Sequence, residues 1–150
     1  MATREEQRVE MLLRIRRRAE RAARRAFQEA LARAQAAGAR VVELAKLLGA
    51  HSDAAREGLL GGGAPHPGEA YRSSAAELRV EIGRRRAELG RMDHELARNR
   101  AELAHAVKRR QAAEMLGEKL VGRLAARRQR RTMRQLDDAH AAHGATGGQP

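Results

Sequence analysis

The sequence predicts an all-α protein in which two long helices form an antiparallel coiled-coil hairpin and the second helix overhangs the first at its C-terminal end. Apolar residues recur at alternating spacings of 3 and 4 over two long stretches, the pattern of a coiled coil. Aromatic residues make up 1% of the chain and charged residues 33%, which disfavours a compact core. A Gly- and Pro-rich segment separates the two stretches.

The first helix is expected at about residues 3–57 of a single rod-like domain, 1–150. Thr3 and Glu6 have the spacing of a capping box, in which the two residues bond each other's backbone amides. The loop is expected at 58–68, because five Gly and two Pro among these eleven residues oppose helix formation.

The second helix is expected at about residues 69–143, a stretch without Pro. Ser73 or Ser74, each followed a few residues later by Glu77, could cap its N-terminus. Residues 144–150 are interpreted as a frayed tail.

The seam between the helices is expected to contain large apolar residues from both. Its spacing starts as 3, 4, 4, 4 in the first helix, which predicts weak local supercoiling. If the second helix folds back along the first, residues whose numbers sum to about 126 lie opposite each other, so that Ala34 faces Met92. Arg85 then falls at a seam position and must extend its charged end out of the seam. The expected seam residues are Leu12, Ile15, Phe27, Val41, Leu44, Leu48, Leu78, Ile82, Leu89, Met92, Leu96 and Leu103.

The overhanging segment, residues 123–143, is named the basic arm. The chain has a net charge of +12, and residues 123–150 contain six arginines and two acidic residues. Because the second helix outlasts the first, these side chains are expected to lack an intramolecular partner and to bind an acidic protein surface. The candidate partner-binding residues are Arg123, Arg127, Arg128, Arg130, Arg131, Arg134, Leu136, Asp137 and Asp138.

Several other functions are disfavoured. The chain has no Cys, and no apolar run approaches the roughly 20 residues that span a bilayer. His140 and His143 could hold a metal with Asp137 and Asp138, but they are interpreted as an exposed helix end. A rod without a concave pocket offers no active site, so no enzymatic activity, metal or cofactor is expected.

Binding of nucleic acid remains an alternative, because the sequence pI of about 11.5 favours contact with phosphates. Only two aromatic residues are available to stack on bases, and no DNA-binding motif is present. A generic structural coiled-coil adaptor is a further alternative.

The basic arm carries a family resemblance. It reads RLAARRQRRTMRQLDDAHAAH, and Arg134, Leu136, Asp137 and Asp138 follow a basic, Leu-Asp-acidic pattern. With its size and expected topology, the chain resembles the FliJ/YscO family of stalk proteins from flagellar export and type III secretion.

The resemblance implies a stalk without enzymatic activity. The helix ends would insert into the hexameric secretion ATPase, and the loop would point toward an export-gate protein. It also implies a cytoplasmic location, at the cytoplasmic face of the inner membrane. Acidic chaperones and export substrates are further partner candidates.

Overall fold

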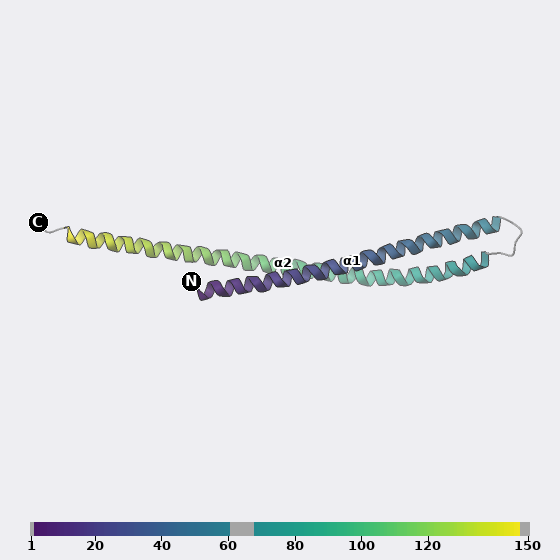
Figure 1. The fold of residues 1–150 in the computed structure, drawn as a ribbon, viewed down its shortest axis with the longest axis horizontal. Coiled ribbons are helices and arrows are strands. Elements are labelled where there is room, and N and C mark those ends of the chain that lie inside the picture. Colours follow the sequence, from purple (N-terminus) through teal and green to yellow (C-terminus); the bar gives the residue numbers. More distant parts are fainter. Residues whose placement is uncertain (1, 61–67, 148–150) are drawn as a thin grey trace. The chain divides into compact units, whose positions relative to one another are not determined.

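The structure, a computed structural model, describes residues 2–60 and 68–147. It contains two long helices, α1 (Arg4–Leu60) and α2 (Gly68–Thr146), and no strand among the described residues (Figure 1). Contacts between the helices pair low residue numbers of α1 with high residue numbers of α2, so the helices are antiparallel. The predicted fold class, an all-α antiparallel hairpin with a C-terminal overhang, is confirmed.

The predicted capping box is present at the start of α1. The Thr3 amide donates to Glu6 Oε2 at 2.5 Å, and the Glu6 amide donates to Thr3 Oγ1 at 3.2 Å. These bonds satisfy amides that have no partner within the helix. The hydrogen bond from the Thr3 amide lowers the pKa of Glu6, because it stabilises the carboxylate.

The helix ends next to the loop differ from the expected ones. Helix α1 continues to Leu60, and residues 61–67 of the expected loop lie outside the described residues. Helix α2 begins at Gly68, so Ser73 and Ser74 lie inside the helix and the prediction that either caps it is wrong. The residues that follow Gly68 are good helix formers, and the acidic Glu69 suits the positive end of the helix dipole.

The chain packs as two units, which are described separately. The central unit is Ala22–Ala104. The terminal unit combines Met1–Arg21 with His105–Pro150.

The core of the central unit combines small and large side chains. Ala30 and Ala34 are buried, as are Leu44 and Ile82, which are 4% and 6% exposed. Across the pair, Arg33 Nη2 lies 3.3 Å from Glu95 Oε1. This contact has a residue-number sum of 128, close to the expected 126. Buried alanines let the two helices approach closely.

The other expected seam residues of the central unit are half-buried. They are Phe27, Val41, Leu48, Leu78, Leu89, Met92, Leu96 and Leu103. Arg85 extends out of the seam, where its guanidinium pairs with Glu81 at 2.9 Å and with Glu88 at 3.3 Å. The hydrogen bond that Arg85 donates to Glu81 is the main cause of the raised pKa of Arg85.

The seam of the terminal unit corrects the sequence interpretation. Ile15 was expected in the seam but is 55% exposed, and Leu12 is half-buried beside it. A regular 3, 4, 3, 4 spacing instead joins half-buried Glu6, Val9, Leu13 and Arg16 with buried Glu20. The expected 3, 4, 4, 4 spacing ran through apolar residues alone, whereas the heptad of the structure places the charged Arg16 and Glu20 in the seam.

Candidate partner-binding site

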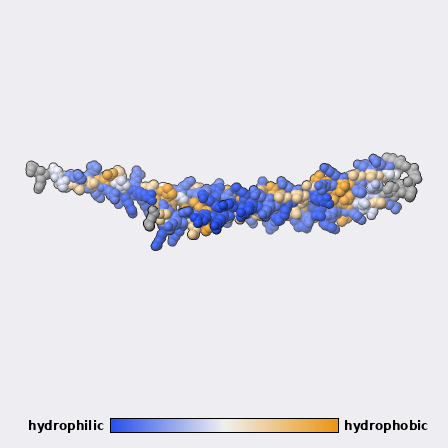
Figure 2. Space-filling view, viewed as in Figure 1, coloured by the Kyte–Doolittle hydropathy of each residue, from blue (hydrophilic) through white to orange (hydrophobic). Residues whose placement is uncertain are grey.

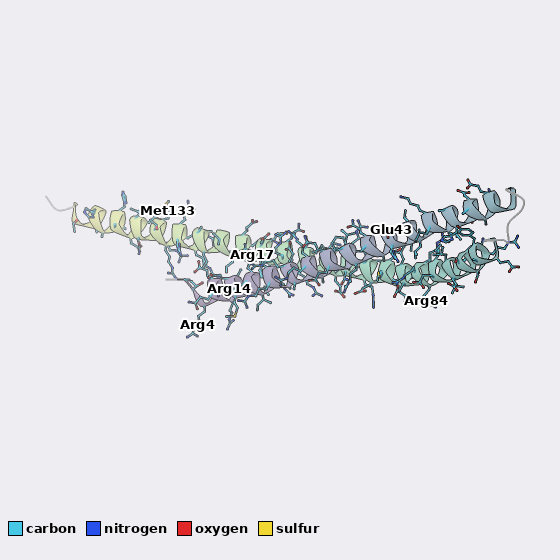
Figure 3. The ribbon with its side chains drawn as sticks, turned by 45° about the vertical axis from the view of Figure 1, so that its right-hand side comes forward. Arg4, Arg14, Arg17, Glu43, Arg84 and Met133 are labelled. Atoms are coloured by element: carbon cyan, nitrogen blue, oxygen red, sulfur yellow. The ribbon has the colours of Figure 1, made fainter. Side chains whose placement is uncertain are left out.

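The basic arm is helical, and from residue 125 onward no described helix packs against it. Helix α2 runs without a break to Thr146, and every described residue from 125 onward is exposed. Figure 3 shows Met133 on this part of α2, beyond the N-terminal end of α1. The last half-buried side chain is Leu124.

The heptad explains why packing ends at Leu124. In the terminal unit, the seam positions of α2 are Ala106, Arg110, Ala113, Gly117, Leu120 and Leu124. The same spacing continues through Arg127, Arg131 and Arg134, which are charged and exposed. A second helix laid on this face would have to desolvate a row of guanidinium groups. The overhang is therefore encoded in the seam positions themselves.

The predicted arm residues lie on this single exposed helix. The predicted residues are Arg123, Arg127, Arg128, Arg130, Arg131, Arg134, Leu136, Asp137 and Asp138. Their side chains point to all sides of the helix, so these residues form no single cluster. Met133 and Leu136 are 56% and 50% exposed and give the arm an apolar stripe. Arg130 and Arg134 share a helix face with Met133. The arm can therefore offer basic and apolar contacts side by side.

The histidines of the arm contact their own helix. Nδ1 of His140 lies 2.8 Å from the Leu136 carbonyl oxygen, and Nδ1 of His143 lies 3.1 Å from that of Ala139. In the Nδ1–H tautomer each ring donates to that carbonyl. In the part of the chain that the structure describes, no three His, Asp or Glu residues gather in a way that could hold a metal ion.

A charged cluster inside the terminal unit was missed by the sequence analysis. Arg110 donates through Nε to Glu20 and through Nη1 to Glu114 at 2.7 Å, and Arg17 lies 3.6 Å from Glu114. Glu20 is only 8% exposed, and the hydrogen bonds that Arg110 donates to Glu114 and Glu20 raise the pKa of Arg110. The sequence does contain a signal for this cluster. A heptad repeat that is continued through Arg16 and Glu20 places Glu20 at a seam position of α1, opposite the seam position of Arg110 on α2.

An open groove of 740 Å³ runs along one side of the terminal unit, where the sequence analysis expected no concave surface. Its apolar floor is formed by Val9, Leu13, Leu120 and Val121. Its acidic rim is formed by Glu6, Glu10, Glu114 and Glu118, and the one basic residue of the lining is Arg17. We call this surface the acidic groove. It has the apolar and charged character of a surface that binds a helix.

Gly117 makes the groove possible. A Cβ atom at this position would lie 3.2 Å from Val9 Cγ1 and 3.9 Å from Leu13 Cδ1. The missing side chain lets the α1 residues sit close to the α2 backbone. It also leaves space above them that a larger residue would fill.

Apolar side chains also lie on the outer surface of the terminal unit. Met11, Ile15, Met115 and Leu116 are each at least 50% exposed. Figure 2 shows such hydrophobic patches among hydrophilic atoms. No helix formed by the described residues has an apolar stretch long and uncharged enough to cross a membrane.

Comparisons with known proteins identify the class of protein that this arrangement belongs to. A family model described as "Flagellar FliJ protein" matches residues 5–147. The chain belongs to the flagellar FliJ protein family. The comparisons with curated proteins and with solved structures gave no match.

Membership makes the chain a component of flagellar or type III export. The family is a cytoplasmic, structural part of the export machinery. This agrees with the family resemblance carried by the C-terminal sequence.

Proposed function

We propose that this chain is the non-enzymatic central stalk of a flagellar or type III export apparatus. Its helix ends enter the hexameric export ATPase, and the region of the loop faces the export gate at the cytoplasmic side of the inner membrane. The chain holds the ring subunits in place and couples their ATP hydrolysis to export. Family membership supports the export role, and the arm supports the contact with the ATPase.

One observation carries the proposal: residues 125–146 form an exposed helix that no other part of the described chain packs against. A protruding helix is a suitable shape for insertion into the central opening of a ring. Its arginines can form two-pronged hydrogen bonds with carboxylates on loops that line such an opening. Exposed Leu136 and Met133 can add apolar contacts at the same surface.

The energies require several contacts to act together. One exposed ion pair contributes only about 0.2–1 kcal/mol, so no single arginine of the arm should determine binding. Five arginines and one apolar contact can give useful affinity together, and that affinity should fall as salt screens the charges.

Deletion of residues 123–150 tests the proposal. The truncated chain should keep most of its helicity by circular dichroism, because the deleted segment contributes almost nothing to the packed seam. It should no longer bind the cognate ATPase or stimulate its hydrolysis. Undiminished stimulation by the truncated chain would show that the arm is not the coupling element.

A pair of charge variants separates the position of the charges from their number. The test variant changes five arginines of the arm to Gln, at Arg127, Arg128, Arg130, Arg131 and Arg134. The control changes five exposed arginines of the central unit to Gln, at Arg79, Arg86, Arg91, Arg98 and Arg100. Only the arm variant should lose ATPase stimulation. Equal losses would indicate a general effect of net charge.

Nucleic-acid binding is a defined outcome of the same experiments. Nonspecific binding would show similar affinity for unrelated DNA sequences and a steep fall with salt. If truncation abolishes DNA binding and the full chain has no effect on the ATPase, the nucleic-acid function replaces the stalk. Acidic chaperones and export substrates are further proposed partners of the arm.

A further inference from the structure

We infer that the acidic groove of one copy binds the basic arm of a second copy, so that the chain forms a reciprocal dimer. The inference concerns self-association and does not depend on the ATPase contact. It rests on the charge, apolar character and spacing of two surfaces within the terminal unit.

The groove and the arm have opposite charges. The groove has four carboxylates and one guanidinium in its lining, although the whole chain has a net charge of +12. Of the four carboxylates, Glu118 forms no ion pair with a described residue, and Glu114 already binds Arg110 and Arg17. Opposed charges of this kind select a basic helix and disfavour an acidic one.

The spacing of the charges also matches. Glu114 and Glu118 are four residues apart on α2, and Arg130 and Arg134 of the arm are likewise four apart. Four residues of helix rise about 6 Å in both cases. An arm that runs antiparallel to the groove can therefore place Arg134 at Glu114 and Arg130 at Glu118 together.

The apolar parts follow the charged ones. Met133 shares a helix face with Arg130 and Arg134, and it is 56% exposed. When these arginines lie at the rim, Met133 can reach the floor formed by Val9, Leu13, Leu120 and Val121. This contact would cover apolar surface on both copies.

Twofold symmetry allows both contacts to form at once. The groove is centred near residue 118 and the arm near residue 132 of the same helix, about 21 Å apart along its axis. A twofold axis near Leu124 brings each arm onto the other copy's groove. Reciprocal contacts of this kind are the commonest arrangement in homodimers.

Reciprocal charge reversal tests this arrangement. One full-length protein has Glu114→Arg and Glu118→Arg, and the other has Arg130→Glu and Arg134→Glu. Alone, each should dimerise about tenfold more weakly than the unchanged chain in sedimentation equilibrium, because four ion pairs per dimer become repulsive. An equimolar mixture should recover dimers, since both of its contacts again join opposite charges.

Controls separate this contact from general charge effects and from misfolding. Glu29→Arg with Glu102→Arg, and Arg79→Glu with Arg86→Glu, make the same charge changes at exposed sites of the central unit. These proteins should dimerise like the unchanged chain. A second groove variant, Glu10→Arg with Glu118→Arg, leaves the contacts of Arg110 intact and should again weaken dimerisation.

Three results would overturn the inference. The first is an unchanged chain that remains monomeric throughout the concentration series. The second is a mixture that associates no better than its two components, which would move any self-association to another surface. The third is an equal loss of dimers in the control variants and the groove variants.

Discussion

The central and terminal units distribute apolar and charged side chains in opposite ways. In the central unit, Leu44 and Ile82 are buried between the helices, and Arg85 extends out to Glu81 and Glu88. In the terminal unit, Glu20 is buried between the helices and pairs with Arg110. Of the ten exposed large hydrophobic residues in the described part of the chain, seven belong to the terminal unit.

This difference separates stability from binding. The central unit places its large apolar residues where they stabilise its own packing. The terminal unit leaves Met11, Ile15, Met115 and Leu116 on the surface and holds its helices together partly through charges. Exposed apolar residues beside charged ones are typical of binding surfaces. We therefore expect mutations to affect mainly stability in the first unit and mainly association in the second.

The largest effect on stability is expected from Leu44→Ala in the central unit. Leu44 is 4% exposed, and truncation of a buried Leu costs about 2–5 kcal/mol. Leu96→Ala should cost less, because Leu96 is only half-buried. Urea denaturation followed by circular dichroism measures both losses.

Leu136→Ala is the matched control for these substitutions. Leu136 is 50% exposed on the arm, so its loss should change the free energy of unfolding by less than about 0.5 kcal/mol. Equal destabilisation by Leu96→Ala and Leu136→Ala would contradict the assignment of the arm as unpaired.

The charged cluster of the terminal unit should give the next largest effect. Arg110→Ala removes one charged partner of buried Glu20 and should destabilise the chain by about 1–3 kcal/mol. Replacing both Glu20 and Arg110 by Leu should recover much of this loss, because the buried carboxylate is then also replaced by an apolar side chain. A double variant that is less stable than Arg110→Ala would mean that the ion pair itself stabilises the seam.

The sequence predicted the central unit better than the terminal one for a physical reason. Apolar periodicity identifies a seam wherever its positions are apolar, as at Leu44, Leu78 and Ile82. It misled at Ile15, because the true seam passes through charged residues there and a second apolar stripe lies on the surface. The helical arm was predictable from composition and length. The groove was not, because it depends on how Gly117 meets Val9.

Glycine substitutions offer a smaller and more local comparison of the two units. Gly83→Ala, in the central unit, should stabilise the chain by about 1 kcal/mol, because Ala favours helix and the added Cβ would meet no atom within 4 Å beyond its own stretch of helix backbone. Gly117→Ala should gain less or destabilise, since Val9 Cγ1 at 3.2 Å must move. Equal gains at both positions, measured by urea denaturation, would show that the contact at Gly117 is loose.

The smallest effect concerns pH at the capping box. The Thr3 amide stabilises the Glu6 carboxylate, so the folded pKa of Glu6 lies below its ordinary value of 4.5. A carboxyl group with a lowered folded pKa stabilises the fold above its unfolded pKa, and this stabilisation is lost as the pH falls through the folded pKa.

Glu6→Gln has no proton to gain there, and its amide oxygen can still accept the bond from Thr3. As the pH falls from about 5 to about 3, a range that surrounds the unfolded pKa of a Glu side chain, the unchanged chain should therefore lose more stability than Glu6→Gln. Thermal unfolding across this range measures the difference, and an NMR titration of the Glu6 carboxyl carbon gives the folded pKa directly. Parallel stability curves for the two proteins, or a Glu6 pKa at or above 4.5, would show that the reciprocal Thr3–Glu6 bonds do not persist in solution.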